Sequence, residues 1–239
     1  MRTTQRPDRR GRPGADPQRL LPRRHQNAKN CLKITIRPVI YPFMPRPANL
    51  ETRSRLLEKG GELISNLGFN ATGVQEITAA AGVPKGSFYN YFESKEAFAL
   101  AILNEYCESM MAAYGPILDQ RDTPPLLRIA RYFEGIAEFH ARRDYAAGCL
   151  IGNMALEVTP TSDLVRARLS AIYRDLTTAL ADCLREAQVK GDLAPAKDPA
   201  RLADALIDTF EGAVMRAKVE RSRAPFDSFE RYVLPSLLT

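Results

Sequence analysis

Apolar residues recur at helical spacing through almost the whole chain after residue 48. In residues 49–67 they form one stripe, with Asn49 as the predicted N-cap and Gly68 as the residue that ends the helix. Two longer stripes follow in residues 162–190 and 198–220, and no segment shows the alternation that marks a β-strand. The pattern therefore predicts an all-α protein. The stripes are, in chain order, Leu56, Gly60, Leu63, Ile64 and Leu67; Leu169, Ile172, Leu176, Ala179, Leu180, Cys183 and Leu184; and Leu202, Leu206, Phe210, Ala213 and Ala217.

Start and stop residues divide this region into separate helices. Thr123, followed by two prolines, begins one helix, because proline is tolerated in a first turn. Ser162 begins one of the two long helices and Gly191 ends it, while Asp198 with Pro199 begins the other. Further helices are predicted over residues 72–81, 85–91, 94–118, 148–158 and 227–237.

The short helices between residues 72 and 91 have the pattern of a helix-turn-helix. Gly82 separates them and supplies the positive φ of a tight turn, and Val83 can fill the gap between two helices. Phe88 and Phe92 are four residues apart, so they share one helical face, which we assign to the core together with Ile77.

Tyr89 and Tyr91 must then point away from this core. They stand beside Lys85, Ser87, Asn90 and Lys95 and form a surface of hydrogen-bond donors, which suits phosphate oxygens and base edges. Lys95 also lies in the first turn of a predicted helix, where a cation opposes the helix dipole. A DNA phosphate at that place would remove the penalty, so the surface predicts contact with double-stranded DNA.

This stretch resembles the DNA-binding domain of the TetR family of bacterial transcriptional regulators. The resemblance implies that the second predicted helix and the third both reach DNA. Family members commonly carry Ser or Thr at the position of Gly73. Gln75 stands three residues after Thr72, so it either reaches DNA or closes a capping box with Thr72. The matching residues are Gly82, Val83, Gly86, Ser87, Phe88, Tyr89, Tyr91, Phe92, Ser94, Lys95 and Glu96, and the implied DNA contacts are Thr72, Gln75, Lys85, Gly86, Ser87, Tyr89, Asn90, Tyr91 and Lys95.

The resemblance also implies a domain order. Residues 49–109 would form a three-helix DNA-binding domain, and residues 110–239 a helical domain that binds a small molecule and pairs two subunits. The continuous apolar faces of residues 162–190 and 198–220 predict a dimerising four-helix bundle, two helices from each chain. An intramolecular core remains the alternative use of those faces.

Cys149 is the second candidate site. It lies between Gly148 and Gly152 at the start of a predicted helix, where the helix dipole and Arg142 or Arg143 would favour the thiolate. The segment is similar to the Gly-Cys-Leu of a TetR subgroup that includes repressors of electrophile-detoxifying reductases and acrylate-responsive regulators. This similarity suggests that Cys149 senses an electrophile or lines the effector pocket, and the alternative is a small buried packing residue. Cys107 and Cys183 lie in apolar stripes and are expected in the core.

The first 48 residues differ in composition from the rest. They carry ten more basic than acidic side chains, although the whole chain has a net charge of +6, and they contain eight prolines. We predict a disordered basic extension, which includes Cys31. It is either an arm that adds non-specific DNA affinity or a solvated tail upstream of a true start at Met44.

Several classes of protein do not fit the sequence. No apolar run is long enough to cross a membrane, no secretory signal is visible, and the default compartment is the cytoplasm. No metal-ligand set, cofactor motif or catalytic constellation is visible, so we predict neither an enzyme nor a cofactor.

The expected function is a homodimeric repressor that a small molecule or electrophile releases from a palindromic operator. The alternatives are a redox or electrophile sensor acting as an activator, and a helical interaction protein without DNA binding.

Overall fold

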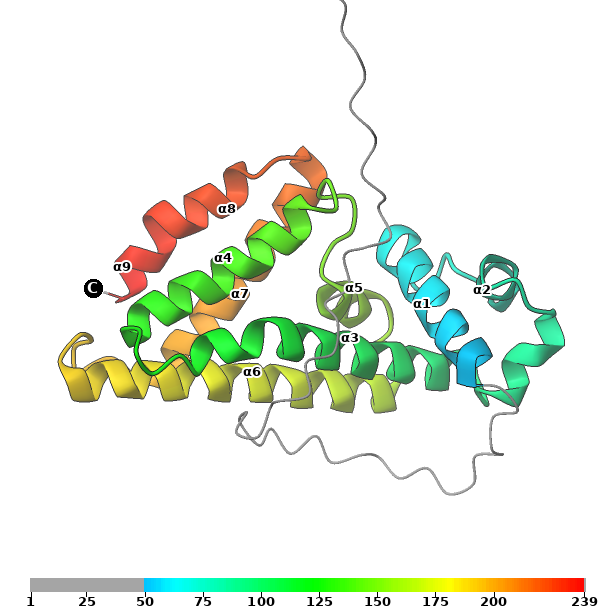
Figure 1. Cartoon of the computed structure of the whole chain (residues 1–239), viewed down its shortest axis with the longest axis horizontal. Coiled ribbons are helices and arrows are strands. Elements are labelled where there is room, and N and C mark those ends of the chain that lie inside the picture. The colour runs from blue at the N-terminus through cyan, green and yellow to red at the C-terminus, as the bar shows by residue number, and fades with distance from the viewer. Residues whose placement is uncertain (1–49, 239) are drawn as a thin grey trace, which may run out of the picture. The chain divides into compact units, whose positions relative to one another are not determined.

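The structure, a computed structural model, describes residues 50–238, and every regular element in this range is helical (Figure 1). The fold is therefore all-α, as predicted. The basic extension, Cys31 and the Asn49 cap lie outside the described residues. The elements are α1 (Leu50–Leu67), α2 (Val74–Ala80), η2 (Lys85–Asn90), α3 (Lys95–Leu118), α4 (Pro125–Ala141), α5 (Leu150–Glu157), α6 (Asp163–Lys190), α7 (Pro199–Glu220), α8 (Ala224–Ser228), η3 (Phe229–Val233) and α9 (Leu234–Leu238).

One hydrophobic core joins α1, α2 and η2 to the first half of α3. Phe88 and Phe92 are 0% and 2% exposed and pack against Phe98, which confirms their predicted place in the core. Gly60 lets α1 approach α3, because a Cβ at that position would lie 2.3 Å from Cζ of Phe98. The prediction for Leu67 was wrong: it is 60% exposed, since it stands in the last turn of α1 beyond this contact.

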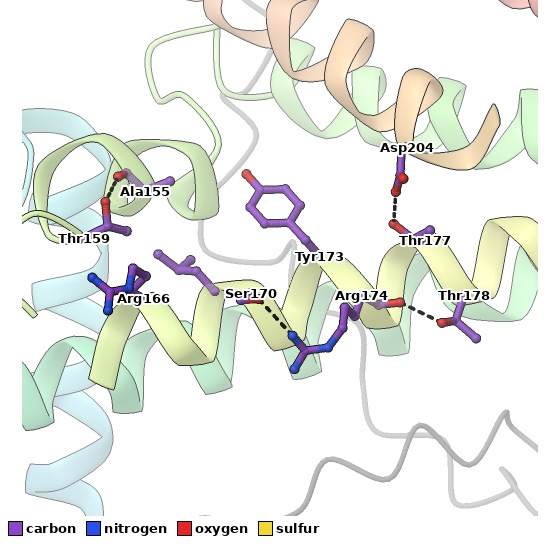
Figure 2. A pocket seen from close by; sticks show the side chains of 10 residues that line it. Ala155, Thr159, Arg166, Ser170, Tyr173, Arg174, Thr177, Thr178 and Asp204 are labelled. Atoms are coloured by element: carbon purple, nitrogen blue, oxygen red, sulfur yellow. Dashed lines mark hydrogen bonds between the residues drawn. The ribbon is translucent and has the colours of Figure 1, made fainter. Parts of the chain in front are cut away.

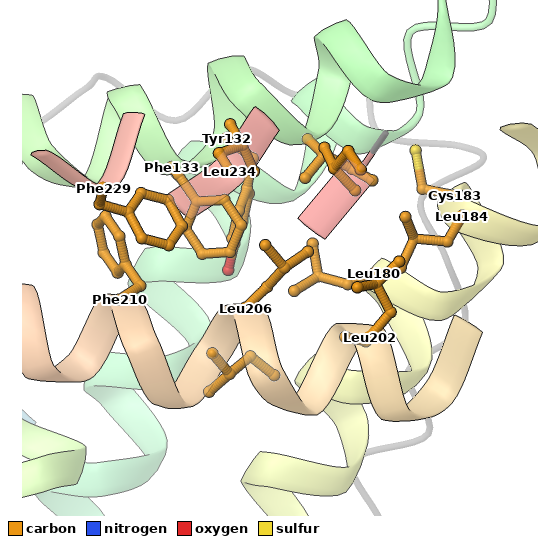
Figure 3. Packing of buried hydrophobic residues seen from close by; sticks show 14 of the residues in the cluster. Tyr132, Phe133, Leu180, Cys183, Leu184, Leu202, Leu206, Phe210, Phe229 and Leu234 are labelled. Atoms are coloured by element: carbon orange, nitrogen blue, oxygen red, sulfur yellow. The ribbon is translucent and has the colours of Figure 1, made fainter. Parts of the chain in front are cut away.

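A second core lies among α4, α6, α7 and the C-terminal helices (Figure 3). Its centre is a group of aromatic rings in which Phe133 and Phe210 are 4.8 Å apart between centroids and each packs against Phe229. The apolar stripes predicted on residues 162–190 and 198–220 pack here or against the first core. These stripes therefore serve the core of one chain.

A buried cation ties three helices of this second core together. Arg128 of α4 is 0% exposed and donates a hydrogen bond of 2.7 Å to the carbonyl oxygen of Leu118, at the end of α3. Its other terminal nitrogen lies 2.5 Å from a carboxylate oxygen of Glu186 on α6. Arg121 and Lys190 also pair with Glu186, and the adjacent cations of Arg128 and Lys190 lower the pKa of that carboxyl to about 2.

The helix α3 belongs to both cores. Leu103 and Cys107 lie in the first core, while Leu118 lies in the second. The predicted boundary between residues 109 and 110 thus falls inside one continuous helix. A single helix therefore joins the two cores.

Candidate DNA-binding surface and effector site

The turn between α2 and η2 exposes most of the predicted donors. Gly82 has a φ of +65°, as the sequence predicted, and it turns the chain from α2 into a short 3-10 helix instead of a full α-helix. Lys85 is exposed and Tyr89 is 57% exposed. Ser87 and Tyr91 are half-buried, while Gln75, Gly86 and Asn90 are exposed.

Thr72 is a correction to the predicted contact set. It is 0% exposed, and its hydroxyl donates a hydrogen bond of 2.7 Å to the carbonyl oxygen of Gly68. The capping-box alternative with Gln75 is wrong as well, because α2 has Gly73 as its N-cap and no side chain caps it. Thr72 braces the loop after α1 and has no side-chain surface to offer DNA.

Lys95 is held within the chain. Its ammonium nitrogen donates a hydrogen bond of 2.5 Å to the carbonyl oxygen of Phe69 and lies 4.1 Å from the centroid of the Phe69 ring. Burial lowers its pKa, and the nearby carboxylates of Glu157 and Glu76 partly offset this. Contact of Lys95 with a phosphate stays a prediction, and it would compete with the Phe69 contacts.

Glu157, in the last turn of α5, bonds to the loop that precedes α2. The backbone N–H of Asn70 donates to its carboxylate at 2.9 Å, and the side-chain amide of Asn70 donates to its carbonyl oxygen at 3.3 Å. Gly68 adopts a φ of +95°, and a Cβ there would lie 2.6 Å from the Glu157 carboxylate. From the sequence, Gly68 was predicted only to end a helix. Glu157 was not predicted, because it lies 87 residues from Asn70, the residue that it contacts.

Cys149 is the N-cap of α5 and is half-buried. Its sulfur lies beside the backbone N–H groups of Ile151 and Gly152 in the first turn of α5, and the carboxylate of Glu211 on α7 lies nearby. Tyr106 of α3 also lies near this sulfur. The site therefore joins groups from three helices that are far apart in the sequence.

The predicted thiolate is contradicted by these surroundings. Burial, followed by the nearby Glu211 carboxylate, raises the pKa of Cys149 well above its usual value, although the two N–H groups act against this. Arg142 donates to the hydroxyl of Tyr114 at 3.1 Å, and the guanidinium of Arg143 lies 5.0 Å from the centroid of the Phe139 ring. Both cations are thus occupied elsewhere. Cys107 and Cys183 are 7% and 4% exposed, which confirms their predicted place in the core.

An open groove of about 680 Å³ runs along α6 and faces α5 and α7 (Figure 2). Thr177 of α6 donates to Asp204 of α7 at 2.7 Å and closes one end of it. Tyr173 rises from α6 between α5 and α7, and burial, followed by the nearby Glu211 and Cys149, raises its pKa. Its ring is half-buried, and it is the lining residue that links the groove to the thiol.

The structure combines a helix-turn-helix that exposes hydrogen-bond donors with a second helical core that carries a half-buried thiol, and α3 and α5 join the two. This arrangement is that of a ligand-responsive DNA-binding transcriptional regulator. Residues 56–102 match the model of the bacterial regulatory proteins of the tetR family, and residues 125–233 match the tetracyclin repressor-like C-terminal domain. The chain belongs to the TetR family. No helix between residues 50 and 238 is long and apolar enough to span a membrane.

Known relatives agree with this assignment. The chain is 40% identical over 191 residues to the HTH-type transcriptional repressor DhaR of Mycobacterium sp. strain GP1, an alignment that covers 80% of this chain and 94% of that protein. The crystal structure of a regulatory protein TetR from Rhodobacter sphaeroides is 34% identical, with a TM-score of 0.74 over 79% of this chain and 99% of that one. The reduced form of NemR from E. coli is 28% identical, with a TM-score of 0.67 over 79% and 98% of the two chains. These relatives are regulators of transcription.

Proposed function

We propose that two copies of this chain bind a palindromic operator in the cytoplasm and repress transcription until an electrophile reacts with Cys149. The proposed domains are residues 49–109 for DNA binding and 110–239 for effector binding and pairing. The observation that supports the first step is the set of exposed donors around η2. In a two-fold dimer, two such elements would enter major grooves about 34 to 36 Å apart, or a multiple of that distance.

Pairing would use the outward faces of α6 and α7. Met215 and Val219 of α7 are 60% and 79% exposed and lie about one turn apart, and Gly212 one turn earlier has open space around it. The groove along α6 borders the same helix pair. A second copy related by a two-fold axis would cover these apolar side chains in both chains at once.

The DNA contacts can be tested by substitution. We expect Lys85→Ala to weaken operator binding by about 1 to 3 kcal/mol and to change the base preference, if Lys85 contacts a base edge. Tyr91→Phe, which removes one phosphate donor, should weaken binding to all sequences alike. The measurement is the dissociation constant on the parent operator and on single-base variants over a range of salt concentrations.

Arg231→Ala is the matched control for this test, because Arg231 is an exposed cation in η3, outside both the proposed DNA surface and the proposed pairing faces. It should leave both affinity and salt dependence unchanged. If Lys85→Ala and Tyr91→Phe bind as tightly as the parent, η2 does not contact DNA.

The proposed route from effector to DNA runs along α5. Cys149 caps the first turn of this helix, and Glu157 in its last turn bonds to Asn70. Phe69 is the neighbour of Asn70, and its carbonyl and ring hold Lys95 at the start of α3. An adduct on Cys149 that displaces α5 would therefore move the loop before α2 and the start of α3 together.

Removal of the Glu157 contact should uncouple the two sites. The relevant quantity is the operator dissociation constant of the protein modified at Cys149, divided by that of the unmodified protein. We expect Glu157→Ala to reduce this ratio by about fivefold or more, since allosteric coupling of about 1 to 3 kcal/mol is common. Glu157→Gln keeps an acceptor for the Asn70 amide and should retain most of the ratio. An unchanged ratio in Glu157→Ala would show that the signal passes elsewhere.

A further inference from the structure

The carboxylate of Glu211 lies beside Cys149, and no cation in the described part of the chain pairs with it. We propose that Glu211 accepts the proton of Cys149 when the thiol reacts, and that this carboxylate restricts the site to uncharged electrophiles. The inference rests on the proposed sensing function, and it adds the chemical class of the effector and a second residue of the site.

The geometry around Gly152 brings the two groups together. A Cβ at Gly152 would lie 2.9 Å from a carboxylate oxygen of Glu211 and 3.8 Å from Cβ of Cys149. The absent side chain therefore leaves the space in which the α7 carboxylate reaches the first turn of α5. A larger residue at position 152 would require the Glu211 carboxylate to shift.

The surroundings of Glu211 are hydroxyl-bearing and apolar. Within residues 50–238 it forms no ion pair, and burial raises its pKa. Tyr106, Tyr132 and Tyr173 all lie near enough to Cys149 and Glu211 to feel their charges. Lys218 lies two turns further along α7 and is half-buried. A Cβ added at Gly148 would lie 3.4 Å from Cδ of Lys218.

The thiol needs a proton acceptor, because burial keeps it protonated and the thiolate is the reactive form. With an α,β-unsaturated carbonyl compound, the sulfur forms a bond to the β-carbon and the π pair of the C=C bond moves into an enolate. The thiol proton passes to the Glu211 carboxylate, and from there to the α-carbon of the enolate. Atoms and electrons balance with no further reactant. A carboxyl with a raised pKa suits this exchange, since it both takes and returns a proton near neutral pH.

The same carboxylate disfavours anions. An anionic electrophile at the sulfur would place a second negative charge beside Glu211 in a site where water screens it poorly, and among residues 50–238 no cation forms an ion pair with Glu211. A neutral electrophile of equal size meets no such repulsion. Uncharged enones, aldehydes and quinones are therefore the class of effector that fits.

Iodoacetamide and iodoacetate test this inference, because both alkylate thiols with loss of iodide and differ in charge. The rate of Cys149 alkylation is measured on the full chain by peptide mass spectrometry. We divide the rate of alkylation by iodoacetamide by the rate of alkylation by iodoacetate, for Cys149 and for free glutathione. The ratio for Cys149 should exceed the ratio for glutathione by about tenfold or more. Glu211→Gln should lower the amide rate by at least about tenfold and bring the ratio towards the glutathione value.

Two results would overturn the inference: a parent ratio equal to that of glutathione, or a folded Glu211→Gln variant that iodoacetamide alkylates as fast as the parent. The parent ratio needs no variant, so the test stands even if Glu211→Gln fails to fold. Glu211→Asp keeps the carboxylate and should retain the charge preference.

Failure of the sensing function looks different. In that case Cys149 is alkylated with the expected preference, but the alkylated protein still holds its operator. The alkylation rates are measured without DNA, so the two outcomes are separable.

Discussion

Cys149→Ser is expected to abolish release of operator DNA by electrophiles such as unsaturated aldehydes and quinones. Serine keeps the size of the residue and leaves α5 in place, but a hydroxyl at neutral pH does not add to these compounds. An adduct occupies a fixed volume at the first turn of α5, which is joined to the loop before α2 through Glu157. A swing from mostly bound to mostly released needs a differential affinity on the order of 5.5 kcal/mol, and a covalent occupant can supply it.

The measurement is operator binding by parent and variant before and after treatment with the electrophile. Untreated Cys149→Ser should bind as the parent does. Cys107→Ser and Cys183→Ser are the controls, because these thiols are only 7% and 4% exposed, whereas Cys149 is half-buried. Release of the Cys149→Ser variant as readily as the parent would make Cys149 a packing residue. A non-covalent ligand, by contrast, would still act on the variant.

The second large effect concerns stability. Arg128→Ala should lower the free energy of unfolding by about 3 to 5 kcal/mol, because it removes one partner of a buried ion pair and leaves a cavity between α3, α4 and α6. Arg128→Met fills the space without a charge and should cost less. Arg121→Ala is the control, since Arg121 pairs with the same carboxylate but is 68% exposed. Because an exposed ion pair contributes about 1 kcal/mol or less, this variant should lose little stability. Urea denaturation at pH 7 measures all three.

The ion pair also predicts a pH dependence. The pKa of Glu186 is lowered from 4.5 to about 2 in the folded chain, so its contribution is present above pH 4.5 and is lost as the pH falls towards 2. The parent should therefore lose more stability between pH 5 and pH 2 than Arg128→Met, in which the buried cation is absent. Equal losses in the two proteins would show that the pair adds nothing to folding.

Helix limits and the helix-turn-helix were readable from the sequence, because they depend on neighbouring residues. Ser94 and Ser162 each accept a hydrogen bond from the backbone N–H three residues later, and Gly191 ends α6 with a φ of +80°. Phe88 and Phe92 went to the core because a four-residue spacing places both on one face. A cap or a stripe is complete within one or two turns, so the sequence contains the whole interaction.

The sequence did not decide which partner each face would meet. The stripes on α6 and α7 predicted a dimerising bundle, with an intramolecular core as the alternative, and the structure buries them in the core of one chain. Thr72 looked like a cap or a DNA contact, yet it is buried because the loop from Gly68 folds over it. The predicted effect of Arg142 and Arg143 on Cys149 failed for a similar reason, since each meets another side chain first.

The sequence by itself thus determined the all-α class, the order of the helices and the donor-rich turn around Gly82. The tertiary structure alone brought Glu211 to Cys149, across 62 positions of the chain, and Glu157 to Asn70, across 87. Hydrophobic burial and helix capping act on patterns that repeat every few residues, whereas the pairing of two polar groups from distant helices depends on how those helices cross. That crossing is set by side-chain packing over the whole core, which no short stretch of sequence contains.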